Sequence, residues 1–277
     1  MTLGSLAALI GSPVDHSLSP AIHRAGFEDA GVDWSYVAFD VAPGQAAEAV
    51  AAMRVLGIAG LSVTMPHKTD VAAAVDSLEP AARALHSVNT VSWDGAELVG
   101  SSTDGAGFVA SLDEQGVDVA GARVAVIGAG GAARSVIDAL GRAGAVEITV
   151  LNRTRERAES AATLASAASV GISSDISRAD IVINATSIGM GVAPDAATED
   201  DLPCAPALLR ADQIIVDLVY HPLQTAWLGK ATDLGARTID GLGMLIHQAV
   251  LQQERWLGVR PDATVMRIAA EAELGSR

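Results

Sequence analysis

The sequence predicts an α/β protein of two domains separated by a cleft, and three observations support this fold class. The chain has 277 residues, of which 50% are hydrophobic, and this is enough for two domains with separate cores. Short β-branched apolar runs alternate along the chain with segments of helical length. A glycine-rich turn directly follows the apolar run 124–127, which is typical of a doubly wound parallel sheet.

We expect the first domain to be an α/β unit made of residues 1–104 together with 243–277. Its predicted strands are 5–11, 35–41, 59–64, 88–93 and 96–100. Its predicted helices are 20–30, 44–56 and two that begin at Pro66 and Glu79. Asp94-Gly95 lies between the last two strands and predicts a hairpin turn.

The second predicted domain, residues 105–242, is a doubly wound sheet of the dinucleotide-binding, or Rossmann, type. A helix that opens at Asp104 leads into it. The predicted strands are 124–127, 146–151, 180–184, 213–218 and 236–239, with helices at 131–143, 155–167 and 224–233. We expect a loop at residues 190–206. Two further helices are predicted at 241–257 and 262–273, after the last strand of the sheet.

The composition excludes several classes of partner. Thirty-three acidic and 18 basic side chains give a formal net charge of −15, which opposes binding to nucleic acid or to an anionic membrane. The single cysteine, Cys204, excludes an internal disulfide and a multi-cysteine zinc site, and the histidines lack metal-ligand spacing, so no metal is expected. We find neither a basic leader nor an uncharged stretch of about 18 residues, and we therefore expect a cytoplasmic protein.

The glycine-rich turn predicts a site for the pyrophosphate of a dinucleotide. Gly128 suits a tight turn, Gly130 allows close approach of the backbone to a phosphate, and Ala133 lets the next helix lie near the strand. The N-terminus of that helix offers free N–H groups to an anion. Glycine turns after strands also occur for structural reasons alone, so the pattern needs a second signal.

The second signal follows the strand 146–151 and indicates which dinucleotide is bound. NAD-specific sheets usually place an acidic residue there for the ribose 2′-hydroxyl, but this chain has Asn152. Arg153, Thr154 and Arg157 follow, and their guanidinium and hydroxyl donors suit a 2′-phosphate. A solvated helix start capped by Thr154 is the structural alternative. An arginine in the first turn of a helix lies at the positive end of the helix dipole, which is unfavourable unless an anion binds there. A bound 2′-phosphate explains the arginines better than solvation does, so we favour NADP.

Polar side chains gather at four junctions of the first domain, where open α/β sheets collect ligands. These segments are 16–20, 64–68, 87–90 and 102–105. Ser19 before Pro20 has the form of a helix N-cap, a role that alone could explain both residues. Ser17 adds a second hydroxyl, and the two serines could instead hold the carboxylate of a small organic acid.

Lys68 and Asp104 are the candidates for proton transfer. With a helix beginning at Pro66, Lys68 falls near its third position, where the dipole disfavours a cation. Such a lysine is a candidate acid or base, although most lysines are solvated surface charges. Asp104 could be a simple N-cap, or a carboxylate that holds the Lys68 ammonium in place.

Eight motifs together resemble the shikimate dehydrogenase family, in that family's order and over residues 8–258. They are Ser17-Leu18-Ser19-Pro20, Thr64-Met65-Pro66-His67-Lys68, Val88-Asn89-Thr90, Ser102-Thr103-Asp104-Gly105, Gly128-Ala129-Gly130-Gly131-Ala132, Asn152-Arg153-Thr154, Asn184-Ala185-Thr186-Ser187-Ile188-Gly189 and Asp240-Gly241-Leu242-Gly243-Met244-Leu245. Each motif is weak by itself, but the ordered set is specific.

The resemblance implies reversible, NADP-dependent reduction of 3-dehydroshikimate to shikimate, a step of aromatic amino acid biosynthesis. It implies a catalytic pair, Lys68 and Asp104, with Lys68 as proton donor. Because a lysine and an aspartate so close titrate as a pair, the division of labour stays open. Substrate contacts would come from Ser17, Ser19, Thr64, Asn89, Tyr220 and Gln248. Cofactor contacts would come from Gly128, Ala129, Gly130, Gly131, Ala132, Asn152, Arg153, Thr154, Arg157, Thr186, Leu218 and Gly241.

The chain also departs from the family pattern, and two other functions stay open. Ser102 stands where the family commonly has Asn, and His86-Ser87 stands where it has Gly-Ala. A quinate/shikimate dehydrogenase that prefers NAD should have an acid after strand 146–151, which is absent here. A catalytically silent NADP-binding regulator should lack the Lys68 and Asp104 pair. The sequence leaves open whether the protein is a monomer or a homodimer.

Overall fold

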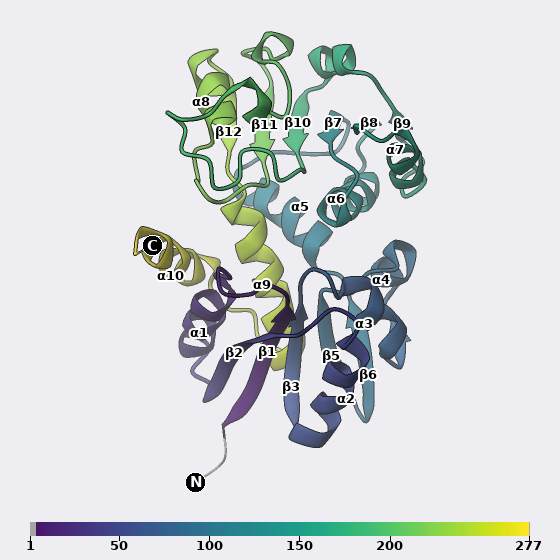
Figure 1. Ribbon diagram of the computed structural model, residues 1–277, viewed down its shortest axis with the longest axis vertical. Coiled ribbons are helices and arrows are strands. Elements are labelled where there is room, and N and C mark those ends of the chain that lie inside the picture. The colour runs from purple at the N-terminus through teal and green to yellow at the C-terminus, as the bar shows by residue number, and fades with distance from the viewer. Residues whose placement is uncertain (1–3, 277) are drawn as a thin grey trace. The chain divides into compact units, whose positions relative to one another are not determined.

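The structure is a computed structural model that describes residues 4–276. The chain forms two compact units, each with its own sheet (Figure 1). Unit 1 contains the described residues up to Gly107 and from Ile246 onward, and unit 2 spans Phe108–Leu245. Both divisions fall inside helices, α5 (Asp104–Glu114) and α9 (Leu242–Leu257). The predicted divisions after residues 104 and 242 lie a few residues earlier.

Unit 1 is built on a mixed six-stranded sheet with the order β2-β1-β3-β5-β6-β4. Its strands are β1 (Ser5–Gly11), β2 (Trp34–Asp40), β3 (Ile58–Val63), β4 (Ser77–Leu78), β5 (Thr90–Asp94) and β6 (Glu97–Ser101). β1 runs parallel to β2 and β3, whereas β5 runs antiparallel to both β3 and β6. The carboxyl ends of β1, β3 and β6 therefore share one edge of the sheet with the start of β5.

Helices cover both faces of this sheet, because alternate side chains of β1 pack in two different cores. Ala8 and Ile10 join a core with Val50 and Met53 of α2 (Ala46–Leu56). Ala7, Leu9 and Tyr36 instead pack in a second core with Phe27 of α1 (Ser19–Asp29). The other helices of unit 1 are α3 (Lys68–Ala74), α4 (Pro80–Leu85) and α10 (Ala263–Gly275), of which α10 packs on α1.

Unit 2 has an all-parallel six-stranded sheet with the order β12-β11-β10-β7-β8-β9. Its strands are β7 (Arg123–Ile127), β8 (Glu147–Leu151), β9 (Ala168–Val170), β10 (Ile181–Asn184), β11 (Ile214–Asp217) and β12 (Arg237–Ile239). Strand order reverses between β7 and β10, and such a switch point is where open α/β sheets bind ligands at their carboxyl ends.

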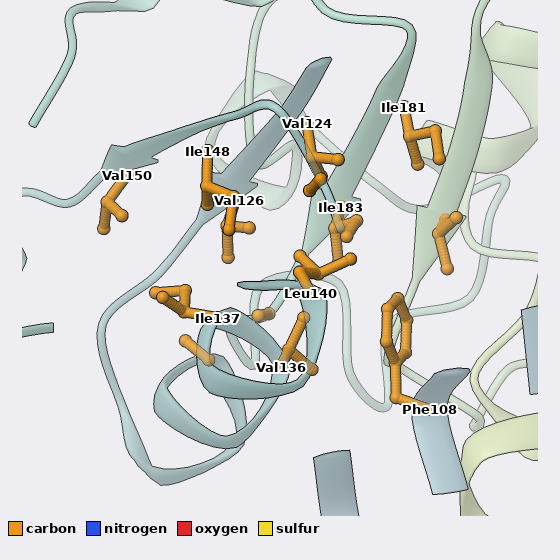
Figure 2. Packing of buried hydrophobic residues seen from close by; sticks show 14 of the residues in the cluster. Phe108, Val124, Val126, Val136, Ile137, Leu140, Ile148, Val150, Ile181 and Ile183 are labelled. Carbon is orange, nitrogen blue, oxygen red and sulfur yellow. The ribbon is translucent and has the colours of Figure 1, made fainter. Parts of the chain in front are cut away.

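The core of unit 2 also lies on both faces of its sheet. On one face, Val124 and Val126 of β7 pack against Ile137 and Leu140 of α6 (Gly131–Arg142), as Figure 2 shows. On the other face, Ala125 shares a core with residues of α8 (Ala226–Asp233). Burying these strands on both faces explains their continuous apolar sequences. The remaining helix of full α type is α7 (Arg155–Ala162).

Most predicted elements are present, but four details are wrong. The predicted helix 155–167 ends at Ala162, and residues 163–167 form a connection that leads into β9. The short strand β4 was not predicted. The helix expected from Pro66 begins at Lys68, which is thus its first residue, and Met65-Pro66 is a cis peptide bond. Ser19 is the first residue of α1 and not its N-cap, which is Leu18.

The hairpin prediction at Asp94-Gly95 is confirmed, because Asp94 pairs with Glu97 across the β5–β6 turn. Within residues 4–276, no helix combines the length and apolar character that crossing a membrane would require.

Candidate active site

The carboxyl edge of the unit 1 sheet brings Lys68 and Asp104 together. Lys68 opens α3 after the turn that follows β3, and Asp104 opens α5 just after β6. Lys68 Nζ donates to Asp104 Oδ2 over 2.6 Å, with 24% and 11% of the two side chains exposed. An ion pair this well covered is costly to break, because the remaining partner keeps an uncompensated charge. The predicted proximity of these two groups is thereby explained by the sheet topology.

Asn89 holds the second oxygen of the same carboxylate. It lies immediately before β5, and its Nδ2 donates to Asp104 Oδ1 over 2.7 Å and to Thr103 Oγ1 over 2.9 Å. Its Oδ1 accepts from the Thr103 amide and from the Thr90 hydroxyl. A hydrogen bond to a charged group contributes about 1.5–3 kcal/mol, so Asn89 fixes the orientation of Asp104. The amide is fully engaged by the protein itself.

Gln248 and Thr64 lie in the same unit as this pair. Gln248 is on α9; its Oε1 lies 3.5 Å from Asn89 Nδ2, and its carbonyl accepts from the Thr103 hydroxyl. Gly107 of α5 allows this close approach of α5 to α9, because a Cβ at position 107 would lie 2.5 Å from the backbone nitrogen of Gln248. Thr64 follows β3, and a Cβ on Gly11 at the end of β1 would lie 2.3 Å from its methyl group. Glycines thus permit close packing of the segments that carry predicted substrate contacts.

The two serines of the first motif have separate local roles. Ser17 Oγ accepts from the Ser19 amide over 3.2 Å, so Ser17 serves the start of α1. The Ser19 hydroxyl lies near the phenol of Tyr36 on β2, where it opposes the rise in the phenol's pKa that burial causes. Sequence reasoning assigned the capping role to Ser19, since a serine before proline is the usual pattern. The hydroxyls remain predicted carboxylate donors.

In unit 2, the two glycines Gly128 and Gly130 of the turn differ in why the position is glycine. Gly128 has φ +123°, and a Cβ there would lie 2.7 Å from the Ala185 carbonyl oxygen, so this turn needs glycine. Gly130 is the N-cap of α6 and has no side-chain cap, while its own missing Cβ would meet nothing within 4 Å. The protein itself therefore does not require glycine at position 130, whereas close approach of a ligand would.

A pocket of about 450 Å³ opens beside this turn. It is lined by Ala129, Gly130, Gly131, Arg134, Glu156, Arg157 and Ser160. Arg134 was missed at the sequence level, although its spacing of one helical turn from Gly130 places it on the same face. Its guanidinium donates to Ser160 Oγ over 3.2 Å. The glycine turn and Arg157 thus border one pocket, although they are far apart in sequence.

The arginines after β8 differ in whether they have partners. Arg155 pairs with Glu159 over 2.9 Å. Arg153 and Arg157 are exposed, and neither has an ion pair with any residue in the range 4–276. Thr154 is the N-cap of α7, but its side chain makes no cap hydrogen bond, and its carbonyl accepts from Asn152 Nδ2. The unpaired guanidinium groups and the free N-cap hydroxyl fit a dianionic 2′-phosphate.

The remaining predicted cofactor residues lie after the carboxyl ends of β10, β11 and β12, and a buried carboxyl links the ends of β10 and β11. Asp217 accepts from the Asn184 amide, the Val219 N–H and the Thr225 hydroxyl. Burial raises the pKa of Asp217 to about 6, and these neutral donors offset only part of the shift. Asn184 Oδ1 in turn accepts from the Thr186 hydroxyl over 2.7 Å.

Leu218 and Gly241 are close together at this end of the sheet. A Cβ on Gly241 would lie 2.3 Å from the Leu218 carbonyl oxygen, so only glycine fits there. Tyr220 follows in the same segment and belongs to unit 2. Its predicted contact with a substrate carboxylate remains a prediction.

Comparisons with known proteins agree with the geometry of both units. Residues 9–91 match the family model described as Shikimate dehydrogenase substrate binding domain. Residues 111–219 match Shikimate / quinate 5-dehydrogenase, and residues 241–271 match Shikimate 5'-dehydrogenase C-terminal domain. These matches cover most of the chain.

Individual relatives cover nearly the whole chain. A shikimate dehydrogenase (NADP(+)) of Symbiobacterium thermophilum is 41% identical over 98% of this chain and 95% of its own. A shikimate 5-dehydrogenase from Thermus thermophilus, solved with NADP(H) and shikimate, is 34% identical, with a TM-score of 0.89 over 97% of this chain and 99% of its own. A ligand-free 5-ketofructose reductase of a Gluconobacter species is 36% identical, with a TM-score of 0.89 over 98% of this chain and 99% of its own.

Proposed function

The chain belongs to the shikimate dehydrogenase family, and we propose that it catalyses the NADP-dependent, reversible reduction of 3-dehydroshikimate to shikimate. The observation that carries this proposal is the Lys68–Asp104 pair, held at 2.6 Å on the carboxyl edge of a sheet. Hydride transfer to a ketone requires a proton for the oxygen, and this pair is a source for it. The activity belongs to the biosynthesis of aromatic amino acids.

We assign the two functions to the two predicted domains. Residues 1–104 with 243–277 bind the substrate, and residues 105–242 bind NADP. In the second domain, the turn Gly128–Ala132 would hold the pyrophosphate, and Arg153, Thr154 and Arg157 would hold the 2′-phosphate. Two features support this assignment: no side chain caps the start of α6, and the guanidinium groups of Arg153 and Arg157 have no ion pair among the described residues. When bound, NADPH supplies the hydride.

Lys68 acts as the proton donor in the direction of reduction. The ammonium has three N–H groups, one of which is given to Asp104, so two remain for the substrate oxygen. Its proton moves from Nζ to the ketone oxygen as that oxygen gains negative charge, and the positive charge stabilises the developing alkoxide. In the reverse direction, the uncharged amine takes the proton back from the hydroxyl.

Asp104 keeps Lys68 in position, and hydroxyl and amide groups are proposed to hold the substrate. Ser17, Ser19 and Tyr220 are proposed to bind the carboxylate. Thr64, Asn89 and Gln248 are proposed to bind the ring hydroxyls. The engagement of Asn89 by Asp104 and Thr103 means that a substrate hydroxyl would have to share or replace one of these bonds. We also propose a cytoplasmic location, which the single Cys204 supports.

The test is a spectrophotometric assay of nicotinamide reduction that crosses shikimate and quinate with NADP and NAD. We expect turnover with shikimate and NADP to exceed the other three combinations by at least about tenfold, since Arg153 and Arg157 favour the 2′-phosphate. Higher turnover with quinate and NAD would instead indicate a quinate/shikimate dehydrogenase. Binding of NADP without turnover of either acid would indicate a regulator.

The similarity to a 5-ketofructose reductase adds one further arm to this assay. 5-Ketofructose has hydroxyls and a ketone but no carboxylate, so the serine pair would be left without its ligand. We expect its reduction with NADPH to be slower than that of 3-dehydroshikimate. Faster reduction would move the substrate assignment to sugars while leaving the Lys68–Asp104 chemistry in place.

A further inference from the structure

Behind Asn89 lies a row of buried polar side chains that the reaction above does not use. His23, Tyr36, Ser62 and Gln252 come from α1, β2, β3 and α9, and each is at most 4% exposed. Burying polar groups is costly unless they are hydrogen-bonded. All four are hydrogen-bonded to one another or to the edge of the active site, so together they form a connected structure that we call the polar row.

Gln252 is the centre of the polar row because its amide is bonded at both ends. Oε1 accepts from Ser62 Oγ over 2.8 Å and lies 3.1 Å from His23 Nε2. Nε2 donates to the Asn89 carbonyl and to Thr90 Oγ1, each over 3.0 Å. An amide has two acceptor positions and two N–H groups, and all four are occupied here.

The protonation of His23 supports this arrangement. Burial lowers the pKa of His23 to about 3, so the ring is neutral and carries a single N–H. Gln253 Nε2 lies 3.1 Å from His23 Nδ1 and also donates to the His23 carbonyl, so Nδ1 is the acceptor. The ring proton is therefore on Nε2 and is donated to Gln252. The ring of Tyr36 stacks on His23 at 4.2 Å.

A series of hydrogen bonds runs in one direction from Tyr36 of the polar row to Asp104. Tyr36 donates to Ser62, Ser62 donates to Gln252, and Gln252 donates to Thr90. Thr90 then donates to Asn89 Oδ1 over 2.7 Å, and Asn89 Nδ2 donates to Asp104. Bonds aligned in this way polarise one another, and the amides transmit the effect from their oxygen to their nitrogen. The series ends on the carboxylate that holds Lys68.

The other end of the series is also at the active site. The phenol of Tyr36 lies near the hydroxyl of Ser19, a residue proposed to bind the substrate carboxylate, and this hydroxyl opposes the rise in the phenol's pKa that burial causes. The polar row therefore connects the proposed carboxylate site with the proton-transfer pair through residues of unit 1 alone.

We propose that Gln252 is a positioning residue for proton transfer, which fixes Asn89 from behind and thereby holds Asp104 and Lys68 in their productive geometry. This inference rests on the proposed function, because it requires Lys68 and Asp104 to be the proton-transfer pair. Misplacement of such a pair by a fraction of an ångström reduces the rate of the chemical step without affecting cofactor binding.

The test replaces Gln252 by methionine, which has a similar shape and no hydrogen-bonding amide. The matched control is Gln253→Met, on the same helix and equally buried, whose amide contacts His23 but neither Asn89 nor Thr90. We measure kcat and the KM for NADP, and normalise kcat to NADP-binding sites counted by titration of NADPH fluorescence. We expect Gln252→Met to lower kcat by about 10- to 100-fold with an unchanged KM for NADP, and Gln253→Met to stay within about twofold of the parent.

A double-mutant cycle separates positioning from a general loss of stability. If Gln252 acts through Asn89, then adding Gln252→Met to Asn89→Ala lowers kcat no further, whereas independent structural losses multiply. Should Gln252→Met fail to fold, Thr90→Val removes the part of the connection that runs through the Thr90 hydroxyl, with a side chain of equal shape. It is expected to lower kcat several-fold.

Two results would overturn the positioning role of Gln252. One is an equal decrease in kcat for Gln252→Met and Gln253→Met, and the other is a double variant whose decrease in kcat is the product of the decreases for Gln252→Met and Asn89→Ala. The activity of the unmodified protein keeps the two hypotheses apart. If that protein does not oxidise shikimate, the proposed function fails. If it does, and Lys68→Ala is inactive while Gln252→Met is not, only the positioning role fails.

Discussion

The polar site of unit 1 and the glycine turn of unit 2 prepare for their ligands in opposite ways. Around Asp104, side chains hold one another: the carboxylate is bonded on both oxygens, and the amide of Asn89 is fully engaged. Around Gly130, the site consists of backbone without a side-chain cap and of the exposed guanidinium groups of Arg153 and Arg157, which have no ion pair among the described residues.

This difference follows from what each ligand supplies. A dinucleotide with a 2′-phosphate carries its own negative charge, so a site of free N–H groups and unpaired arginines is completed by the ligand. A ketone is uncharged at the reacting oxygen, and a proton donor must be positioned before the substrate arrives. The site for chemistry is therefore pre-organised by the protein, whereas the site for binding is left open.

The largest effect is expected from removing the proton donor. Lys68→Ala should lower kcat by about 10³-fold or more, about 4 kcal/mol, because both proton transfer and the charge near the alkoxide are lost. NADP affinity should change less than about twofold, since the cofactor residues lie in unit 2. The measurement is steady-state kinetics with shikimate together with an NADPH fluorescence titration. Retained turnover would show that Lys68 does not carry out the proton step.

The next largest effect is expected at the open site. Arg153→Ala combined with Arg157→Ala should weaken NADP by about 10²-fold and NAD by less than about threefold, because only NADP has the 2′-phosphate. Raised salt should weaken NADP binding to the unmodified protein and have little effect on the double variant. The measurement is a titration with each cofactor at two salt concentrations. The control is Arg155→Ala, since Arg155 is paired with Glu159. Equal weakening of both cofactors would contradict the phosphate assignment.

A third prediction compares the buried carboxyls of the two units. Asp104 has a cationic partner, whereas Asp217 has only neutral donors, and burial raises its pKa from 3.8 to about 6. The folded state therefore binds the proton more tightly than the unfolded state does. The resulting stability is fully present below pH about 4 and is lost as the pH rises to about 6.

The difference should be on the order of 2 kcal/mol in the free energy of unfolding. Asp217→Asn should remove the decrease in the free energy of unfolding between pH about 4 and about 6. The exposed control Asp233→Asn should retain this decrease. Urea unfolding at several pH values provides the measurement. If the free energy of unfolding depends on pH in the same way for the parent and for Asp217→Asn, the pKa of Asp217 is not raised in the folded state.

The smallest effect on stability is expected for Gly130→Ala, which tests whether the turn serves the ligand or the fold. A Cβ at Gly130 meets nothing, so the free energy of unfolding should change by less than about 1 kcal/mol, whereas NADP should bind about tenfold more weakly. Gly128→Ala is the opposite case, because its φ of +123° and its contact with Ala185 make the change costly to the fold. Thermal unfolding with and without NADP distinguishes the two. Unchanged NADP affinity in Gly130→Ala would remove this glycine from the cofactor site.

Sequence periodicity was sufficient for most of the fold. The strand 5–11 and the Asp94-Gly95 hairpin are found as predicted, because apolar alternation and turn chemistry are local properties. The predicted helix 155–167 was too long, since its alanine- and serine-rich end has helical propensity, but residues 163–167 form the connection between α7 and the paired strand β9, Ala168–Val170. Tertiary pairing outweighed local propensity in this segment.

For the site, the sequence by itself determined which residues carry charge and where the backbone must be glycine. The turn from Gly128, the arginines after β8, and the Lys68 and Asp104 motifs could all be read from local patterns. Only the tertiary structure decided how the polar groups are partnered across the sheet: Gln252 supports Asn89 from α9, and Ser62 of β3 donates to Gln252. The physical reason is distance along the chain, because hydrogen bonds between residues far apart in sequence leave no periodic signal and depend on the packing of β3, β5 and α9.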